Sequence, residues 1–327
     1  MSIRTKLCAI AASILFTSMM LPSWSLAASK TSDRMILQKY HFVSSAVYEG
    51  AAAKELRKFA DSVIQELSQQ ELFKTWSGAD TLIEPLGPGT HSWLITIQDS
   101  SERNNSTSSS GYLIISVAEN GEYKLVEYGL GPDSIFAKST LENALVNSGL
   151  KLSTNARWSI IPVYSGPVLA EWALSKEGVS RMEHFLDART GELLPENEES
   201  FTAQASRYIP PATAAGGSQA LPDIRADRLV FTSDSFDPYD NILWMADSGA
   251  INVISETFEK VLLNNKKLVF VSSGKNRTYS VPLPIFGYQK WSRQDDSTLY
   301  MMSGSESSPR FISLQALTDS GKFIKYN

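Results

Sequence analysis

The sequence has one cysteine in 327 residues, and this residue, Cys8, lies close to the N-terminus. Residues 28–327 contain no cysteine, so a chain without the first 27 residues has no thiol. It then forms no disulfide bond and has no cysteine nucleophile. Histidine is almost as rare, because the only three are His41, His91 and His184, and they are too widely separated to have the spacing of zinc ligands.

Motifs for nucleophilic catalysis are also missing. The sequence has no G-x-S-x-G segment, in which a serine nucleophile stands on a sharp turn between a strand and a helix. Ser248 precedes a predicted helix, where the positive helix end favours an anion, but nucleophilic catalysis also needs a nearby base. All histidines come before residue 185, so we interpret Ser248 as an N-cap or surface residue. No catalytic residue is predicted.

The sequence has fewer basic than acidic residues. The 30 basic residues are outnumbered by 35 acidic ones, which gives a net charge of −5 at pH 7. Loss of residues 1–27 removes Arg4 and Lys6 but no acidic side chain. A chain with an acidic excess is not attracted to nucleic-acid phosphates or to anionic lipids. Nucleic acid is therefore not expected as a partner.

The N-terminus has the three parts of a secretory signal peptide. Arg4 and Lys6 form a basic start, residues 7–20 are mostly apolar, and Ser25-Leu26-Ala27 has the pattern of a cleavage site. No later stretch has about 20 uninterrupted apolar residues, the length of a membrane-spanning helix. We expect a secreted protein of the extracellular space or cell envelope, free of the membrane once residues 1–27 are cleaved. A retained N-terminal anchor is the alternative. Export without cysteine is more typical of a Gram-positive bacterium than of a eukaryotic secretory pathway.

Residues 28–195 are predicted to form an α+β domain. Residues 51–67 carry apolar side chains at helical spacing and charged side chains opposite, which predicts an amphipathic helix. Asn120-Gly121 lies between two predicted strands and predicts a hairpin with a type I′ turn. Further predicted elements are strands at 91–97, 112–118 and 123–130 and, after a Ser139–Glu142 capping box, a helix at 140–148.

A linker and a second α+β domain are predicted to follow. Residues 196–228 are acidic and then rich in Pro, Gly and Ala, without apolar periodicity. Residues 229–327 contain a helical stripe from Ile251 to Leu262, after which come short strand signals. This order loosely resembles one half of a papain-like protein without its chemistry. We expect helices packed on antiparallel sheets in both domains, with strands of the second domain at 268–272, 279–283, 288–291, 299–303 and 310–314.

Three strand signals follow one another between Arg157 and Pro195. Turn clusters separate strands predicted at 159–164, 168–175 and 179–187, which together form an antiparallel meander. The last strand runs into Asp187-Ala188-Arg189-Thr190-Gly191-Glu192. Gly191 can adopt a positive φ there, and Asp187 can accept backbone hydrogen bonds. These residues therefore predict a tight turn.

The stretch Phe185 to Leu194 resembles the closing strand and turn of PepSY-type modules, which commonly end on an Asp-Ala-x-Thr-Gly-Glu sequence. PepSY-like domains occur in exported bacterial proteins and in protease propeptides, where they bind or restrain a protease domain. The resemblance implies a protein-binding sheet. An unrelated meander that happens to end on Asp-x-x-Thr-Gly is the alternative.

Four side chains are candidate binding residues. His184 and Trp172 lie in the meander, and Tyr288 and Trp291 lie in the densest aromatic patch of the second domain. His184 would be a general base only if a carboxylate oriented it. No partner at suitable spacing is visible, so we interpret it as a half-exposed sheet histidine.

Asp234, Asp237 and Asp240 recur every third residue and offer the oxygen ligands that calcium prefers. They lack the alternating spacing of an EF-hand loop, and aspartate is common in turns. No metal and no other cofactor is predicted.

The sequence favours a secreted, non-enzymatic binding or inhibitory protein that contacts a protein partner, such as an extracellular protease, through an edge of its antiparallel sheet. The alternative is an exported hydrolase, either a degenerate papain-like enzyme or one with an unrecognised active site. A structural protein of the cell envelope is a third hypothesis. The oligomeric state does not follow from the sequence.

Overall fold

The computed structural model describes residues 40–42, 51–87, 92–98, 109–118, 121–131, 134–147, 157–205, 224–246, 249–272, 279–293 and 296–326. These residues form a mixed fold of helices and mainly antiparallel sheets, which confirms the predicted fold class in its coarse form. The predicted signal peptide, His91 and most of the predicted linker lie outside the described residues. Within these ranges, no helix is both long enough and apolar enough to cross a membrane.

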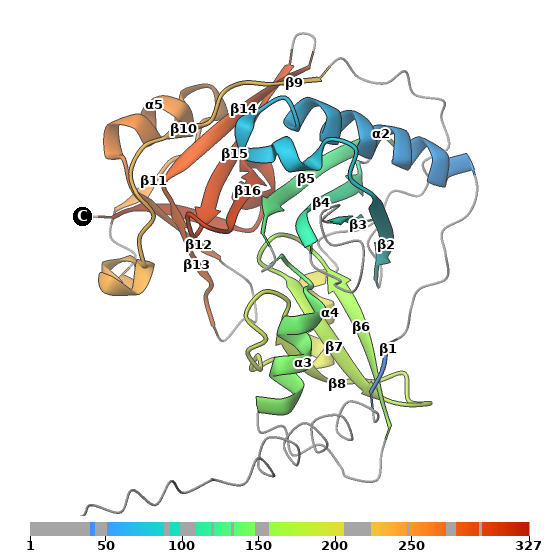
Figure 1. The fold of residues 1–327 in the computed structure, drawn as a ribbon. Helices are drawn as coiled ribbons and strands as arrows, with labels where there is room; N and C mark the ends of the chain where they lie inside the picture. Colours follow the sequence, from blue (N-terminus) through green and yellow to red (C-terminus); the bar gives the residue numbers. More distant parts are fainter. Residues whose placement is uncertain are drawn as a thin grey trace, which may run out of the picture.

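The largest sheet runs in the order β10-β14-β15-β16-β5-β4-β3-β2, with β9 paired to β14, and it curls into a half-barrel (Figure 1). The pairing of β5 with β16 places strands of both predicted domains side by side in one sheet. The strands are β2 (Thr81–Leu86), β3 (Ser92–Gln98), β4 (Ser109–Val117), β5 (Tyr123–Leu130), β9 (Ile224–Ala226), β10 (Val230–Phe231), β14 (Gly287–Arg293), β15 (Asp296–Gly304) and β16 (Pro309–Ser313).

Helix α2 (Ala51–Leu67) packs against one face of this sheet, where the sequence predicted an amphipathic helix. Its stripe of Leu56, Phe59, Val63 and Leu67 is buried. The same cluster contains side chains from both ends of the sheet, including Trp93 of β3 and Trp291 of β14, so the sheet curves around the helix. The short 3-10 helix η1 (Glu71–Trp76) continues this core with Phe73 and Trp76.

A smaller sheet in the order β11-β17-β12-β13 covers the opposite face of β14–β16, together with α5 and α6. Helix α5 begins at Ser255 and not near Ile251, because Ile251 pairs with Phe323 as a strand residue. Its predicted N-caps at 247 and 248 lie outside the described residues. The elements are β11 (Ala250–Ile251), α5 (Ser255–Asn265), β12 (Leu268–Ser272), β13 (Pro282–Ile285), α6 (Leu314–Thr318) and β17 (Gly321–Lys325).

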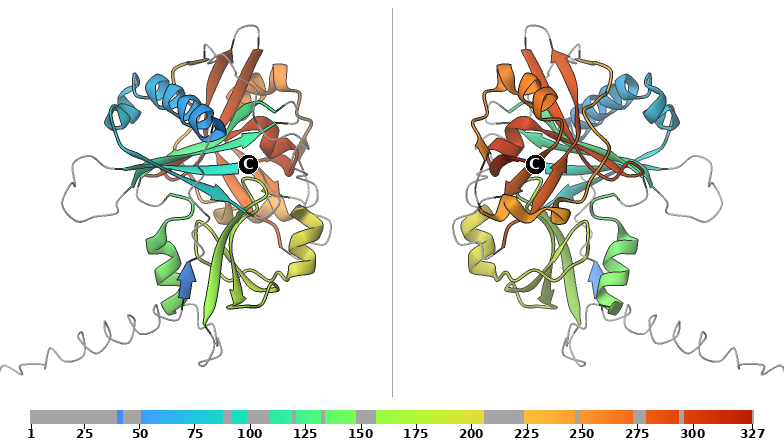
Figure 2. Two further views of the ribbon diagram at one scale, coloured as in Figure 1. Left: turned by 90° about the vertical axis from the view of Figure 1, so that its right-hand side faces the viewer. Right: turned by 90° about the vertical axis from the view of Figure 1, so that its left-hand side faces the viewer.

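The predicted meander is confirmed as the core of a third sheet, in the order β1-β6-β7-β8. Strand β1 (Tyr40–Phe42) adds to it in parallel beside β6 (Trp158–Tyr164), and β7 (Ala170–Lys176) and β8 (Met182–Asp187) follow. Helices α3 (Lys138–Asn147) and α4 (Glu198–Ala205) lie on opposite sides of this meander sheet, as Figure 2 shows.

Local boundaries differ from the sequence predictions at three places. Helix α3 starts one residue before the predicted Ser139 cap, so Ser139 lies inside the helix. Residues 196–228, predicted as a linker, contain α4 and the strand β9. In the β4–β5 hairpin, the Ala118 N–H donates to the Glu122 carbonyl (2.8 Å) and the Gly121 N–H to the Ala118 carbonyl (2.8 Å). Three residues therefore lie inside the loop, one more than a type I′ turn has.

The turn after β8 forms as the sequence predicts. The Asp187 carboxylate accepts hydrogen bonds from the backbone N–H groups of Arg189 and Thr190, both at 2.8 Å. Gly191 has a φ of 74°, in the region that favours glycine. The chain then folds back along β8, where the Leu194 N–H donates to the Phe185 carbonyl at 2.8 Å.

Gly191→Ala should destabilise the protein more than Gly178→Ala. Both glycines have positive φ, 74° and 80°, so alanine adds backbone strain at each. A Cβ at Gly191 would also lie 2.8 Å from the Ala144 Cβ, whereas a Cβ at Gly178 has no neighbour within 4 Å. We expect Gly191→Ala to lower the free energy of unfolding by about 1–3 kcal/mol more than Gly178→Ala does, as measured by urea unfolding. Equal losses would show that α3 does not pack against this turn.

A buried ion pair joins the two halves of the large sheet. On β16, Arg310 donates to Glu127 of β5 through Nε–Oε1 (2.7 Å) and Nη2–Oε2 (2.9 Å). The Tyr112 hydroxyl also donates to Glu127, and the Arg310 Nη2 donates to the Pro167 carbonyl of the meander at 3.1 Å. Burial alone would lower the pKa of Arg310, but the Glu127 carboxylate reverses this effect and raises it.

Arg310→Met should cost about 3–5 kcal/mol of unfolding free energy, because it leaves the Glu127 carboxylate buried without its cation. The double variant Glu127→Gln/Arg310→Met should lose less unfolding free energy than Arg310→Met alone. The control is Lys74→Met, which removes an exposed ion pair to Glu71 (3.2 Å) and should change stability by less than about 1 kcal/mol. Urea unfolding measures all three. A similar small loss for Arg310→Met and Lys74→Met would contradict the structural role of the buried pair.

Candidate binding surfaces

The two candidate residues of the meander differ in burial. Trp172 on β7 is 4% exposed and meets Phe136 edge-on, with ring centroids 5.2 Å apart. His184 on β8 is half-buried, and its ring centroid lies 5.6 Å from that of Trp158. Among the described residues no carboxylate hydrogen bonds to this imidazole. The geometry therefore does not provide the oriented base that histidine catalysis needs.

The two candidate residues of β14 point to opposite faces of the large sheet. The Tyr288 hydroxyl donates to Glu259 of α5 at 2.6 Å, and burial, followed by Glu259, raises the pKa of this tyrosine. Trp291 lies in the core under α2, where its Nε1 donates to the Tyr128 hydroxyl at 3.0 Å. The four predicted binding residues thus occupy three separate places and do not form one site.

The aspartates at 234–240 contribute to a turn. The Asp237 carboxylate accepts the backbone N–H of Tyr239 at 2.9 Å and caps the 3-10 helix η3 (Pro238–Asp240). Across the described ranges, no group of three His, Cys, Asp or Glu side chains is arranged to hold a metal ion.

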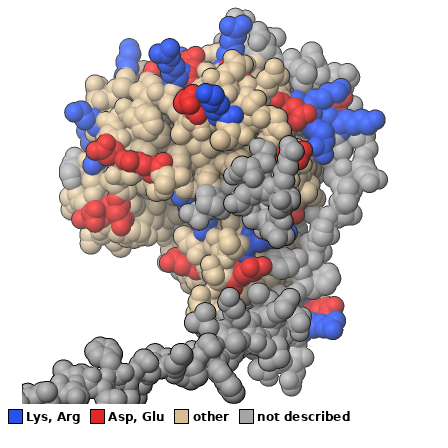
Figure 3. Space-filling view, in the orientation of Figure 1, with Lys and Arg blue, Asp and Glu red and all other residues tan. Residues whose placement is uncertain are grey.

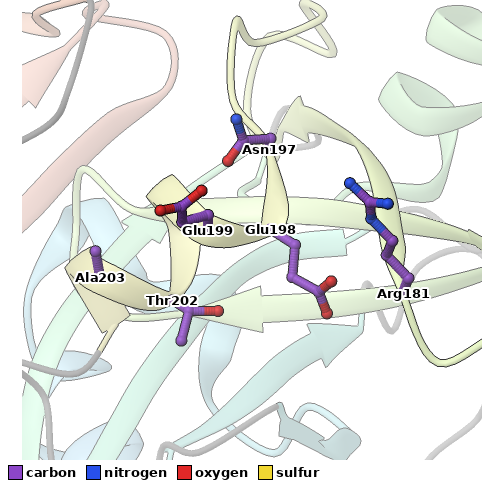
Figure 4. A pocket seen from close by; sticks show the side chains of 6 residues that line it. All are labelled: Arg181, Asn197, Glu198, Glu199, Thr202 and Ala203. Atoms are coloured by element: carbon purple, nitrogen blue, oxygen red, sulfur yellow. The ribbon is translucent and has the colours of Figure 1, made fainter.

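A hollow of about 580 Å³ lies between the start of β8 and the start of α4. In Figure 4, the side chains of Arg181 and Glu198 extend over the meander sheet from either side of this hollow. Asn197 accepts the Ser200 N–H at 2.9 Å and caps α4. The lining residues are Arg181, Asn197, Glu198, Glu199, Thr202 and Ala203, a set without a paired nucleophile and base.

The most unusual surface is a run of apolar side chains on η3 and the following 3-10 helix η4 (Ile242–Ala246). Tyr239, Ile242, Leu243 and Met245 are each between 55% and 66% exposed. We call these four residues the apolar lobe. Large apolar residues are common on protein surfaces singly, but a group of them marks an interaction site.

The apolar lobe is held in place by buried contacts beneath it. Trp244 is 7% exposed, and its Nε1 donates to the carbonyl of buried Pro238 at 2.9 Å. The Trp244 side chain also joins a small core with Val269, Val271 and Ile324 of the neighbouring sheet. The backbone that carries the four exposed side chains of the lobe is therefore held in place.

Three aspartates lie on the same segment as the apolar lobe. Asp234, Asp237 and Asp240 are all exposed, and Figure 3 shows an acidic group on the otherwise uncharged lobe that η3 and η4 form at the lower left. Partial burial raises the pKa of Tyr239, and the negative charges of Glu192 and Asp237 raise it further. Glu192 of the meander turn thus contributes to the negative potential at this surface.

Sequence reasoning missed the apolar lobe. The run Ile242-Leu243-Trp244-Met245 is apolar at four successive positions directly after a polar turn, and this was the available signal. Trp244 is buried because it packs against β12 and β17, whereas its neighbours remain exposed. These strands are distant in the sequence, so the local pattern does not predict this arrangement.

Trp244→Phe should loosen the apolar lobe, because the Pro238 carbonyl loses its buried donor. We expect the free energy of local opening at residues 239–246 to fall by about 1–3 kcal/mol. Hydrogen exchange followed by mass spectrometry measures this, with the strands of the meander as an internal reference. Unchanged exchange at 239–246 would mean that this hydrogen bond does not hold the lobe.

Comparison with models of known protein families and with curated proteins finds no match for this chain. The PepSY resemblance of Phe185 to Leu194 and the loose resemblance of residues 229–327 to a papain-like half therefore stay predictions.

Proposed function

We propose that this chain is a secreted, non-enzymatic binding protein and that the apolar lobe is its contact with a protein partner. The observation that carries the proposal is the exposure of Tyr239, Ile242, Leu243 and Met245 on one fixed segment. Burying large apolar side chains against a partner would stabilise a complex, and aromatic and methionine side chains are enriched in such interfaces.

The rigidity of the lobe supports binding. A contact surface that is already ordered loses little conformational entropy when a partner arrives, so more of the interaction energy appears as affinity. The buried Trp244 and its hydrogen bond to Pro238 supply this order. Trp244 therefore keeps the contact residues in place without contacting the partner itself.

The charge around the lobe supports a particular kind of partner. The exposed Asp234, Asp237 and Asp240 lie on the same segment as the lobe, and we call them the acidic rim. An acidic rim disfavours an anionic membrane surface and favours a protein whose apolar site is bordered by lysine or arginine. An extracellular protease with such a site agrees with the PepSY resemblance and is the partner class that we propose.

Side chains, more than strand addition, are proposed to hold the partner. The outer edge of β8 is occupied from Phe185 onward by its own chain, because Leu194 and Asp187 form backbone hydrogen bonds there. Strand β13, which borders the smaller sheet, contains Pro282 and Pro284, and proline has no N–H to offer an added strand. These two edges are therefore poor sites for the sheet extension that the sequence suggested.

The proposal is tested with residues 28–327 as bait for proteins in the medium of the producing cells, followed by affinity measurement with the purified partner. Ile242→Ser/Leu243→Ser/Met245→Ser should lower the affinity at least about 10-fold, because contact residues of this kind each contribute on the order of 1 kcal/mol or more. The affinity of the unchanged protein should also fall as salt is raised, since the acidic rim attracts a basic surface.

The matched control is Leu72→Ser/Leu82→Ser/Val179→Ser, which removes three other exposed apolar side chains. This control should bind as the unchanged protein does. Equal affinity of the lobe variant and the control would contradict the proposed contact. Failure to isolate any extracellular protein partner would contradict the proposed function itself.

A further inference from the structure

A second hollow, of about 270 Å³, lies between α2 and the half-barrel. Four aromatic side chains line it: Phe59 of α2, Tyr123 of β5, Trp291 of β14 and Tyr300 of β15. We call it the aromatic hollow. It shares no residue with the apolar lobe, and its walls come from both predicted domains.

The walls of the aromatic hollow are fixed before any ligand arrives. The Tyr300 hydroxyl donates to the Leu125 carbonyl at 2.8 Å, and the Trp291 Nε1 donates to the Tyr128 hydroxyl at 3.0 Å. The Trp291 and Tyr300 rings meet edge-on with centroids 5.8 Å apart. A ligand that enters therefore meets ordered aromatic surfaces.

A chain of buried polar groups supports the wall at Trp291. Tyr128 donates to the Gln289 side-chain oxygen, and the Gln289 Nε2 donates to Gln70 Oε1 (2.9 Å) and to the Asp227 carbonyl (2.7 Å). The segment after α2 and the segment around β9 are thereby tied to β14. These hydrogen bonds hold the Trp291 side chain, which is 6% exposed, in place at the wall of the hollow.

Charged side chains line the rest of the aromatic hollow. Arg293 Nη1 lies 3.4 Å from Glu122 Oε2, and both side chains are 40% exposed. Lys124 is exposed and lines the same hollow. Two cations and one carboxylate therefore line the hollow, and the ion pair between Arg293 and Glu122 is long and solvent-exposed. Exposed pairs of this kind contribute little and can exchange partners at small cost.

We propose that the aromatic hollow binds a small planar aromatic molecule that carries a carboxylate. The ring packs among Phe59, Tyr123, Trp291 and Tyr300, since offset and edge-on ring contacts add to the free energy of burying apolar area. The carboxylate is received by Arg293 and Lys124. The volume lies below the roughly 300–1,000 Å³ of pockets for drug-sized ligands, which limits the ligand to one ring system.

The test compares three probes that share an indole ring: indole-3-acetate (anionic), 3-methylindole (neutral) and tryptamine (cationic). Titration calorimetry with residues 28–327 should show indole-3-acetate binding at least about 10-fold more tightly than tryptamine, the effect of one charge-assisted hydrogen bond. Arg293→Gln/Lys124→Gln should lower the affinity for indole-3-acetate to that for 3-methylindole. Lys290→Gln, on the same strand but outside the lining, should leave all three affinities unchanged.

Thr298→Phe should fill the aromatic hollow from β15 and abolish binding of all three probes, with folding checked by circular dichroism. Equal affinities for the three probes, no binding of indole-3-acetate at millimolar concentration, or unchanged affinity in Arg293→Gln/Lys124→Gln would each overturn the proposal. The apolar lobe is intact in these variants, so these results are independent of the proposed protein contact.

Discussion

The fold depends on the buried ion pair between Glu127 and Arg310. Glu127 lies on β5 and Arg310 on β16, so the pair stands where the early and late parts of the chain meet in one sheet. Arg310 also donates to the Pro167 carbonyl and thereby connects the meander. Loss of one partner alone would leave an unpaired charge at this depth, which would be strongly destabilising. β15 and β14 follow β16 in this sheet and lie opposite α2, and the aromatic hollow lies between α2 and these strands.

The two proposed binding sites use different parts of this framework. The apolar lobe rests on the small core around Trp244, Val269 and Ile324, whereas the aromatic hollow lies on the α2 side of the large sheet. A buried hydrogen bond supports each site. The Trp244 Nε1 donates to the Pro238 carbonyl beneath the apolar lobe, and the Trp291 Nε1 donates to the Tyr128 hydroxyl at the hollow. Because the two sites share no residue, the proposed protein partner and the proposed small ligand would not compete for the same side chains. Neither site requires a titrating nucleophile, which agrees with a binding role.

Local features of the fold were predictable from the sequence, and long-range pairings were not. The helix at 51–67, the meander and the Asp187–Gly191 turn each depend on periodicity or turn chemistry within a few residues, and all three are confirmed. The β5–β16 pairing joins residues more than 180 positions apart and leaves no local signal. For the same reason, sequence reasoning named Trp291 but missed its neighbours in the hollow, and it missed the exposure of the apolar lobe entirely.

Native-state hydrogen exchange at increasing, sub-denaturing urea concentrations tests most directly whether the shared sheet makes the chain one cooperative unit. The pairing of β5 with β16 predicts that the slowest amides of β4, β5, β15 and β16 converge on a single opening free energy with a single urea dependence. A distinctly lower opening free energy for β14–β16, with β4 and β5 still protected, would contradict the closure of the two halves through Glu127 and Arg310.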